Sequence, residues 1–180
     1  VFNGQLPKLN KTEFHVEVEP LGETAAPVII TQSEYMRRMK DMASIQPGMS
    51  FYGEMPDMFS MVLNSDHKLV KQVLDDAESA CAEKLVPVES EIAMLKLRET
   101  ELHKAHEGKK DEEIPTTEKD ELKDVEQKLT EQKQQKDAIV NEYAASNKIV
   151  HQLIDLALLQ NNMLKGEALN NFVKRSVELI

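Results

Sequence analysis

The chain has no tryptophan, and aromatic residues make up only 4% of its 180 residues. Apolar residues still amount to 41%, so the expected core is aliphatic and mainly helical. A chain of this length is about the size of one domain, or of one domain that carries an insertion. Two independent hydrophobic cores are therefore not expected.

Basic residues are fewer than acidic ones, 22 against 32, which gives a formal net charge of −10. Nonspecific nucleic-acid binding depends on Lys and Arg neutralising phosphates, so nucleic acid is not an expected partner. No apolar run approaches the ~20 residues that a transmembrane helix needs, so no membrane partner is expected. Cys81 is the only cysteine, which excludes an internal disulfide and favours a reducing compartment such as the cytoplasm. Residue 1 is Val, and we expect a fragment of a longer protein.

Signals of catalysis are few. Ser65, Asp66 and His67 are adjacent in sequence, which cannot give the geometry of a catalytic triad and favours a helix-capping turn. There is no Gly-rich phosphate loop and no cysteine cluster. No catalytic residue and no cofactor is therefore assigned to this chain.

Two histidines offer the best metal-binding pattern. His103 and His106 lie about one helical turn apart, with Glu99 or Glu107 as further ligands. Their charged surroundings favour ordinary surface residues, so no metal ligand is assigned.

The first 80 residues predict a small sheet with helices. The stretches "FHVEVE" (14–19) and "PVIIT" (27–31) are predicted to be paired strands, and "MFSMVLN" (58–64) a third strand. Ser33 is expected to cap a helix that reaches about residue 43. Ser65 or Asp66 is expected to cap a second helix, which opens with "SDHKLVKQVL".

Seven of the nine methionines lie between residues 33 and 61. Methionine surfaces adapt to many apolar partners, so a binding surface and ordinary core packing both remain open. Core packing is favoured for Met58 and Met61, which lie in a strand-like run. The candidate surface comprises Tyr35, Met36, Met39, Met42, Met49 and Phe51.

Residues 81–145 differ from the rest of the chain in composition. Between positions 75 and 142 there are 20 acidic and 11 basic residues and no aromatic side chain before Tyr143. Heptad-like spacings predict a long antiparallel coiled-coil hairpin that turns near residue 112, with Leu129 facing Leu95 and Val125 facing Glu99. Pro87 is expected to kink the first arm or to lie near its start. The apolar seam positions are Leu85, Val88, Ile92, Leu95, Leu102, Leu122, Val125, Leu129, Ile139 and Tyr143.

The second arm is predicted to run without a break into "NKIVHQLIDLALLQNNMLKG", where Gly166 ends it, and residues 167–180 form a closing helix. This helical pair carries more apolar surface than one small sheet covers. A second copy of the chain would cover it as a four-helix bundle, which predicts a homodimer. The alternative is that the surplus packs on the sheet or on another domain.

Three segments together resemble the C-terminal domain of the ninety-kilodalton heat-shock chaperones, of the bacterial high-temperature protein G type. They are "PVIITQSEYMRRMKDM", "FSMVLNSDHKLVKQV" and "LIDLALLQNNMLKGEALNNFVKRSVELI". The last is the strongest, with Gly166, Phe172, Lys174 and Arg175 in the family's closing pattern. The charged hairpin is not part of the family's common core.

The resemblance implies a non-enzymatic part of an ATP-dependent chaperone, whose ATP and magnesium bind in a distant N-terminal domain. It implies a dimerisation domain at residues 1–80 and 146–180, interrupted by the hairpin at 81–145. The helix at Tyr35, Met36, Met39 and Met42 would contact unfolded or partly folded client proteins. The implied dimer interface is Leu153, Leu156, Ala157, Leu169, Phe172, Val173, Val177 and Ile180.

The expected fold is thus α+β: a small mixed sheet with helices, a long antiparallel coiled-coil hairpin insertion, and a C-terminal helical hairpin in a dimeric four-helix bundle. The expected function is homodimerisation and client contact, in the cytoplasm. The alternative is a coiled-coil scaffold or adaptor that binds a protein partner through the hairpin. A metal-dependent hydrolase is a more distant third hypothesis.

Overall fold

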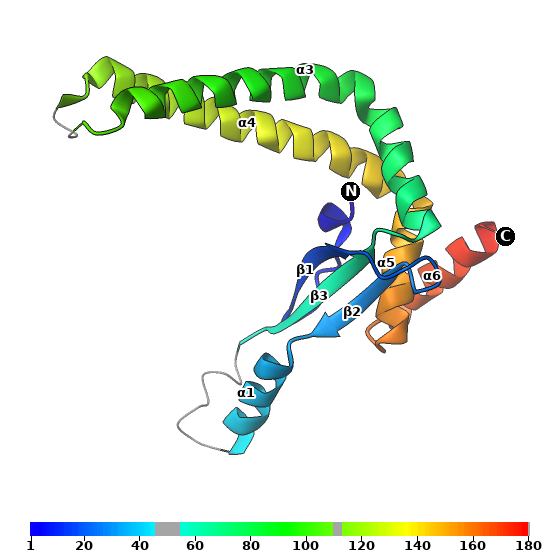
Figure 1. The fold of residues 1–180 in the computed structure, drawn as a ribbon. Coiled ribbons are helices and arrows are strands. Elements are labelled where there is room, and N and C mark those ends of the chain that lie inside the picture. The colour runs from blue at the N-terminus through cyan, green and yellow to red at the C-terminus, as the bar shows by residue number, and fades with distance from the viewer. Residues whose placement is uncertain (46–54, 110–112, 180) are drawn as a thin grey trace. The chain divides into compact units, whose positions relative to one another are not determined.

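A computed structural model describes residues 1–45, 55–109 and 113–179 of the chain and has the expected α+β fold (Figure 1). The chain divides into two compact units. Unit 1 comprises Val1–Ala77 and Ala144–Ile180, and unit 2 comprises Glu78–Tyr143. The assignment of these parts to a dimerisation domain and an insertion stays a prediction.

Unit 1 contains a mixed sheet built from β1 (Thr12–Glu19), β2 (Val28–Gln32) and β3 (Asp57–Asn64), preceded by the short 3₁₀ helix η1 (Asn3–Gln5). The strand order is β1-β3-β2, with β1 parallel to β3 and β2 antiparallel to it. The small mixed sheet was predicted correctly. The direct pairing of the first two strands was wrong, because β3 lies between them.

The buried side chain of Asn64 explains this crossing. Its Nδ2 donates to the carbonyl oxygens of Gly22 (2.8 Å) and Ala26 (3.3 Å), and its Oδ1 accepts from the backbone N–H of Leu21 (3.0 Å). The connection from β1 to β2 is therefore held at the end of β3. A tight two-residue hairpin would have paired the two strands directly.

One face of the sheet forms the main core. Met61 is 0% exposed, so its predicted core position is confirmed. Met58 is 47% exposed, and the core position predicted for it was wrong. The two are three positions apart in the sequence, an odd spacing that puts them on opposite faces of a strand. The buried core comprises Phe2, Val28, Met61, Leu63, Val70, Val73, Val150, Leu153, Ile154, Ala157, Leu158 and Leu164.

Helix α5 (Lys148–Gln160) packs against β2 and against α6 (Gly166–Glu178). The predicted continuous passage from the second arm into this helix was wrong, because the side chain of Asn147 caps α5 by accepting from the N–H groups of Ile149 (3.0 Å) and Val150 (3.1 Å). Helix α5 ends at Gln160, and Gly166, with φ of 60°, begins α6. Gly166 is therefore not a helix stop.

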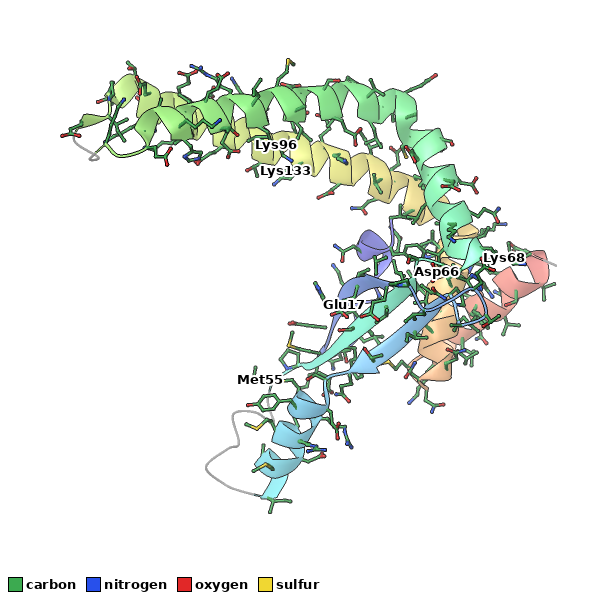
Figure 2. All side chains as sticks on the ribbon, in the orientation of Figure 1. Glu17, Met55, Asp66, Lys68, Lys96 and Lys133 are labelled. Atoms are coloured by element: carbon green, nitrogen blue, oxygen red, sulfur yellow. The ribbon has the colours of Figure 1, made fainter. Side chains whose placement is uncertain are left out.

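Helix α3 (Lys68–His106) starts one residue after His67, whose Nδ1 accepts from the N–H of Leu69 (3.2 Å). The capping turn is confirmed, but neither Ser65 nor Asp66 supplies the cap. Asp66, just before α3 in Figure 2, instead accepts from the N–H of Gly22 (3.0 Å). Its carboxylate is thus used to hold a loop.

Unit 2 consists of the larger part of α3 and of α4 (Thr116–Ser146), which run antiparallel (Figure 1). Its core comprises buried Leu102, Val125 and Leu129, with partly buried Ile92, Leu95 and Leu122. Pro87 lies inside α3 and not at its start. Helix α4 begins at Thr116, so Thr116 and Thr117 lie within its first turn and do not precede it. The packing details of a coiled coil stay a prediction.

Candidate interaction surfaces

The α5–α6 pair is held together by polar contacts at its centre. Arg175 forms an ion pair with Asp155, and both side chains are about four-fifths buried, at 21% and 18% exposed. Gln152 Nε2 donates to Ser176 Oγ (2.6 Å). These contacts fix how α6 lies on α5, which decides which of its apolar residues point outward.

A second ion pair closes the end of the same helix pair. Lys148 Nζ lies 2.7 Å from Glu178 Oε2. The hydrogen bond from Lys148, helped by the attraction of its charge, lowers the pKa of the Glu178 carboxyl below its ordinary value. Both side chains are more than half exposed, so this contact contributes little to folding.

The structure distributes the predicted dimer-interface residues over three environments. Leu153 and Ala157 are buried in the chain's own core, at 4% and 0% exposed. Val173 and Val177 are exposed, at 52% and 70%. The partly buried members are Leu156, Leu169 and Phe172. Ile180 lies outside the described residues.

We call Val173, Val177, Leu156, Leu169 and Phe172 the terminal surface. Val173 and Val177 lie one turn apart on the same face of α6, because residues four apart are neighbours on a helix. The prediction missed Leu179, which is 45% exposed just after α6 and belongs to the same closing segment. The apolar character of that closing segment was the signal that could have identified Leu179.

Helix α1 (Glu34–Ile45) carries the predicted client-binding stripe. Tyr35 and Met42 are exposed, at 68% and 44%, whereas Met36 and Met39 are partly buried. Ile45, three residues after Met42, is 80% exposed and was missed by the prediction. Met49 and Phe51 lie outside the described residues.

A cavity of about 410 Å³ opens between α1 and the second face of the sheet. Met36 and Met58 contribute apolar side chains to its lining, and Phe14 and Phe59, which alternate onto the core face of the sheet, also border it. The two phenylalanine rings contact each other with centroids 5.9 Å apart. The exposed position of Met58 is thus part of a recess that no sequence pattern indicated.

The rest of the cavity lining is polar and acidic. It comprises Glu13, His15, Glu17, Ser33 and Ser60. Ser60 Oγ donates to Glu17 Oε1 (3.0 Å), and Figure 2 marks Glu17 on β1. Among the described residues, Glu13 makes no ion pair and accepts no side-chain hydrogen bond. The cavity therefore combines an apolar part with uncompensated negative charge.

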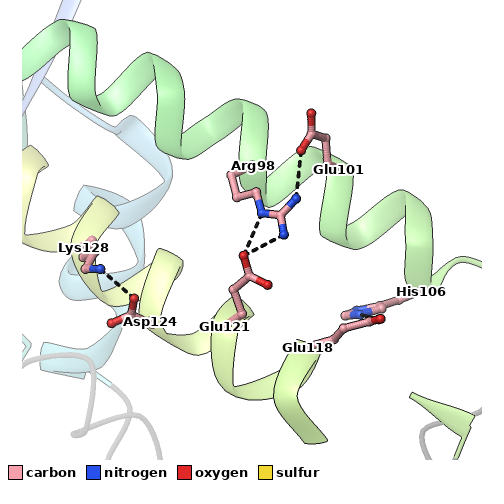
Figure 3. A network of polar contacts seen from close by, with 7 residues as sticks. All are labelled: Arg98, Glu101, His106, Glu118, Glu121, Asp124 and Lys128. Carbon is pink, nitrogen blue, oxygen red and sulfur yellow. Dashed lines mark hydrogen bonds and ion pairs between the residues drawn. The ribbon is translucent and has the colours of Figure 1, made fainter. Parts of the chain in front are cut away.

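The histidines of unit 2 separate into two groups. His106 contacts Glu118 through Nε2 (3.1 Å), which ties the ends of α3 and α4 together (Figure 3). His103 lies with Glu99 and Glu126 so that one ligand atom of each falls within 4.8 Å of the others. The two histidines thus do not share a site, contrary to the pattern considered from sequence.

Ion pairs on the surface of unit 2 shift two pKa values. Hydrogen bonds from Arg98 to Glu121 and Glu101 raise the pKa of the Arg98 guanidinium (Figure 3). A hydrogen bond to Asp124 raises the pKa of Lys128 in the same way. These side chains are solvated, so the contacts orient the surface without contributing much to stability.

No helix in the described part of the chain is long and apolar enough to cross a lipid bilayer.

The chain is similar to curated chaperone proteins from bacteria. It is 65% identical to the chaperone protein HtpG of Bacteroides fragilis over 99% of its length, and 62% identical to that of Bacteroides thetaiotaomicron over 99%. It is 44% identical to the HtpG of Porphyromonas gingivalis over its whole length. In each case it spans 26% of the relative's own length.

No protein-family model matches the chain, and no solved structure matches it. The kinship of the chain rests on sequence identity, which extends through the charged hairpin as well as unit 1. The resemblance noted in the terminal segments is confirmed. The chain belongs to the HtpG family of heat-shock chaperones.

Proposed function

We propose that this chain is the C-terminal, dimerisation and client-contacting part of an HtpG chaperone, and that it catalyses no reaction itself. The observation that carries the proposal is the terminal surface. Val173 and Val177 are exposed one turn apart on α6, a helix joined to α5 by the ion pair of Asp155 and Arg175. An ordered apolar face of this kind suits a second copy of itself across a two-fold axis.

The apolar surface is large enough to contribute measurably to association. Fully burying an exposed valine stabilises a complex by roughly 1.5 to 3 kcal/mol, and the two-fold axis would bury two valines from each chain. Scaled by their exposed fractions, the four valines contribute roughly 4 to 7 kcal/mol. Losing rigid-body freedom costs about 4 to 15 kcal/mol, so the partly buried Leu156, Leu169 and Phe172 must contribute the remainder.

Client contact is proposed for α1. Tyr35, Met42 and Ile45 present apolar side chains to solvent, while Met36 leads into the cavity beside β1. Flexible methionine side chains accommodate apolar segments of differing shape, which suits binding of unfolded chains. Met49 and Phe51 remain proposed members of this surface on sequence grounds alone.

The chain would work in the cytoplasm as a homodimer that binds unfolded or partly folded proteins, without nucleic acid or membrane as partner. It would bind no cofactor. ATP and magnesium would bind in another part of the full-length chaperone.

The dimer is tested by the double variant Val173→Glu/Val177→Glu. Four buried glutamates near a two-fold axis would repel one another, so we expect monomers by sedimentation velocity. Val86→Glu is the matched control, because Val86 is 62% exposed on α3 of unit 2 and should leave the dimer unchanged. A double variant that sediments as the parent chain does would contradict the proposed interface.

A second function is favoured by an exposed apolar row on α3. Val86, Met94 and Leu97 are 62%, 66% and 63% exposed within unit 2. A hairpin with such a face fits the scaffold hypothesis, in which unit 2 binds a protein partner. Replacing residues 82–144 by a short linker separates the two functions. If the chain is a dimerisation domain, the shortened chain should remain a folded dimer. If it is a scaffold, the main defect should be loss of binding to the protein partner.

A further inference from the structure

The cavity beside α1 has features that the proposed client contact does not explain. Helix α1 alone offers an apolar surface, but the cavity joins Met36 and Met58 to the carboxylates of Glu13 and Glu17. Its volume of about 410 Å³ is at the lower end for ligand pockets, which fits a few side chains and not a folded partner. Any ligand must therefore match both an apolar and an acidic lining.

Charge around the cavity favours a basic ligand. Two cations of α1, Lys40 and Arg38, are already engaged by acidic groups of the same chain, since Lys40 pairs with Asp57 (2.7 Å) and Arg38 pairs with Glu34. Glu13 has no such partner in the part of the chain that the structure describes. Among the described residues, the Glu17 carboxylate accepts a side-chain hydrogen bond only from the neutral hydroxyl of Ser60, so its negative charge is not neutralised by that contact.

The spacing of the two carboxylates sets the spacing of the ligand's charges. Glu13 and Glu17 are four residues apart on β1 and lie on the same face of the strand. At about 3.3 Å per residue, their backbone positions are roughly 13 Å apart, too far for one cation to contact both. An extended peptide has the same repeat, so its residues i and i+4 match the two carboxylates.

We propose that the cavity binds an extended segment of an unfolded client in which two Lys or Arg side chains lie at positions i and i+4, with an apolar residue at i+2. The basic side chains contact Glu13 and Glu17, and the apolar side chain packs against Met36 and Met58. The inference rests on the proposed client contact and names the class of segment that is bound. Basic residues flanking one apolar residue would thus distinguish preferred client segments from merely apolar ones.

The test is an NMR titration of the isotope-labelled 180-residue chain with three short peptides. The first has Lys at i and i+4 and Leu at i+2, the second is its isomer with the two Lys residues adjacent, and the third has Gln in place of both Lys residues. We expect the first peptide to bind most tightly and to shift the signals of His15 and Ser60.

Variants of Glu13 and Glu17 test whether these two carboxylates cause the preference for the first peptide. An exposed ion pair contributes about 0.2 to 1 kcal/mol, or roughly 1.4-fold to 5-fold in affinity. Glu13→Gln/Glu17→Gln should therefore weaken binding of the first peptide by about 2-fold to 25-fold and leave the third unchanged. Glu19→Gln is the matched control, because Glu19 lies on the same strand and face but outside the cavity lining.

The failures of the two proposals are distinguishable. Equal affinity for all three peptides, with no effect of the double variant, would overturn the charge-spacing inference while supporting apolar client contact. No binding of any peptide would overturn both the inference and client contact, and would leave the proposed dimer untouched. Weakening by Glu19→Gln as large as that by the double variant would reduce the effect to general charge attraction and overturn the specific site.

Discussion

Asn64, at the end of β3, is fully buried, and its side-chain oxygen and nitrogen are both hydrogen-bonded. Besides its contacts to the loop after β1, its Oδ1 accepts from the N–H of Asp66 (3.1 Å), so one side chain organises both turns at this end of the sheet. A buried amide is stabilising only because all of its partners are present.

We expect Asn64→Ala to lower the free energy of unfolding by about 2 to 5 kcal/mol, because it leaves several buried backbone groups without partners. Urea denaturation followed by circular dichroism measures this. Asn171→Ala, at an exposed position on α6, is the control and should change stability by less than about 0.5 kcal/mol. Similar values for the two variants would show that the loop finds other partners.

The Lys148–Glu178 pair gives a prediction on pH. The folded pKa of Glu178 lies below its ordinary value, so the ionised carboxyl favours the folded chain at neutral pH. This contribution is lost as the pH falls through the folded pKa. Lys148→Gln should raise the pKa of Glu178 towards its ordinary value, which a carboxyl NMR titration detects. An unchanged pKa would mean that the ion pair is not formed in solution.

Asn147 matters at the scale of whole elements, because it ends the passage from α4 and caps α5. Asn147→Ala should destabilise the chain by about 0.5 to 2 kcal/mol, whereas Asn147→Gly should cost only a few tenths of a kcal/mol. Thermal or urea unfolding compares the two variants. If glycine is as costly as alanine, the side chain acts through contacts other than the cap.

The elements themselves could largely be predicted, because their spacings are local. The strand at residues 58–64, the helix after Ser33 and the helical hairpin follow from alternation and helical periodicity. The cap at Asn147 was overlooked because the apolar pattern continues across this position. An asparagine within a continuous helical pattern looks like an ordinary residue inside a helix. The face of the sheet on which Met58 lies depends on the alternation of side chains along the strand. Because residues 58–63 are mostly apolar, the sequence does not show which of them face the core.

The strand order and the cavity could not be predicted, because both depend on segments distant in the sequence. The cavity lining comes from β1, from the start of α1 and from β3. In the sequence, Glu13 and Glu17 are typical of the solvent-facing side of an alternating strand. Only the structure shows that they line one cavity with Met36 and Met58. In the same way, only the fold shows that Leu153 and Ala157 face the core while Val173 and Val177 face solvent.

At the scale of the molecule, the division into two compact units predicts that unit 1 folds without unit 2. Unit 1 buries its own core without residues 78–143, so a chain with residues 82–144 replaced by a short linker should still fold and unfold in one cooperative transition. Calorimetry measures this, and sedimentation reports whether the dimer persists. A shortened chain without a cooperative transition would show that unit 2 is needed to fold unit 1.

The most direct test of the central claim is the mass of the unmodified chain in solution. Sedimentation equilibrium across micromolar concentrations should give about twice the 20.4 kDa of one chain, with dissociation on dilution if the association is reversible. A folded particle of 20.4 kDa at every concentration would contradict the terminal surface as a dimer interface.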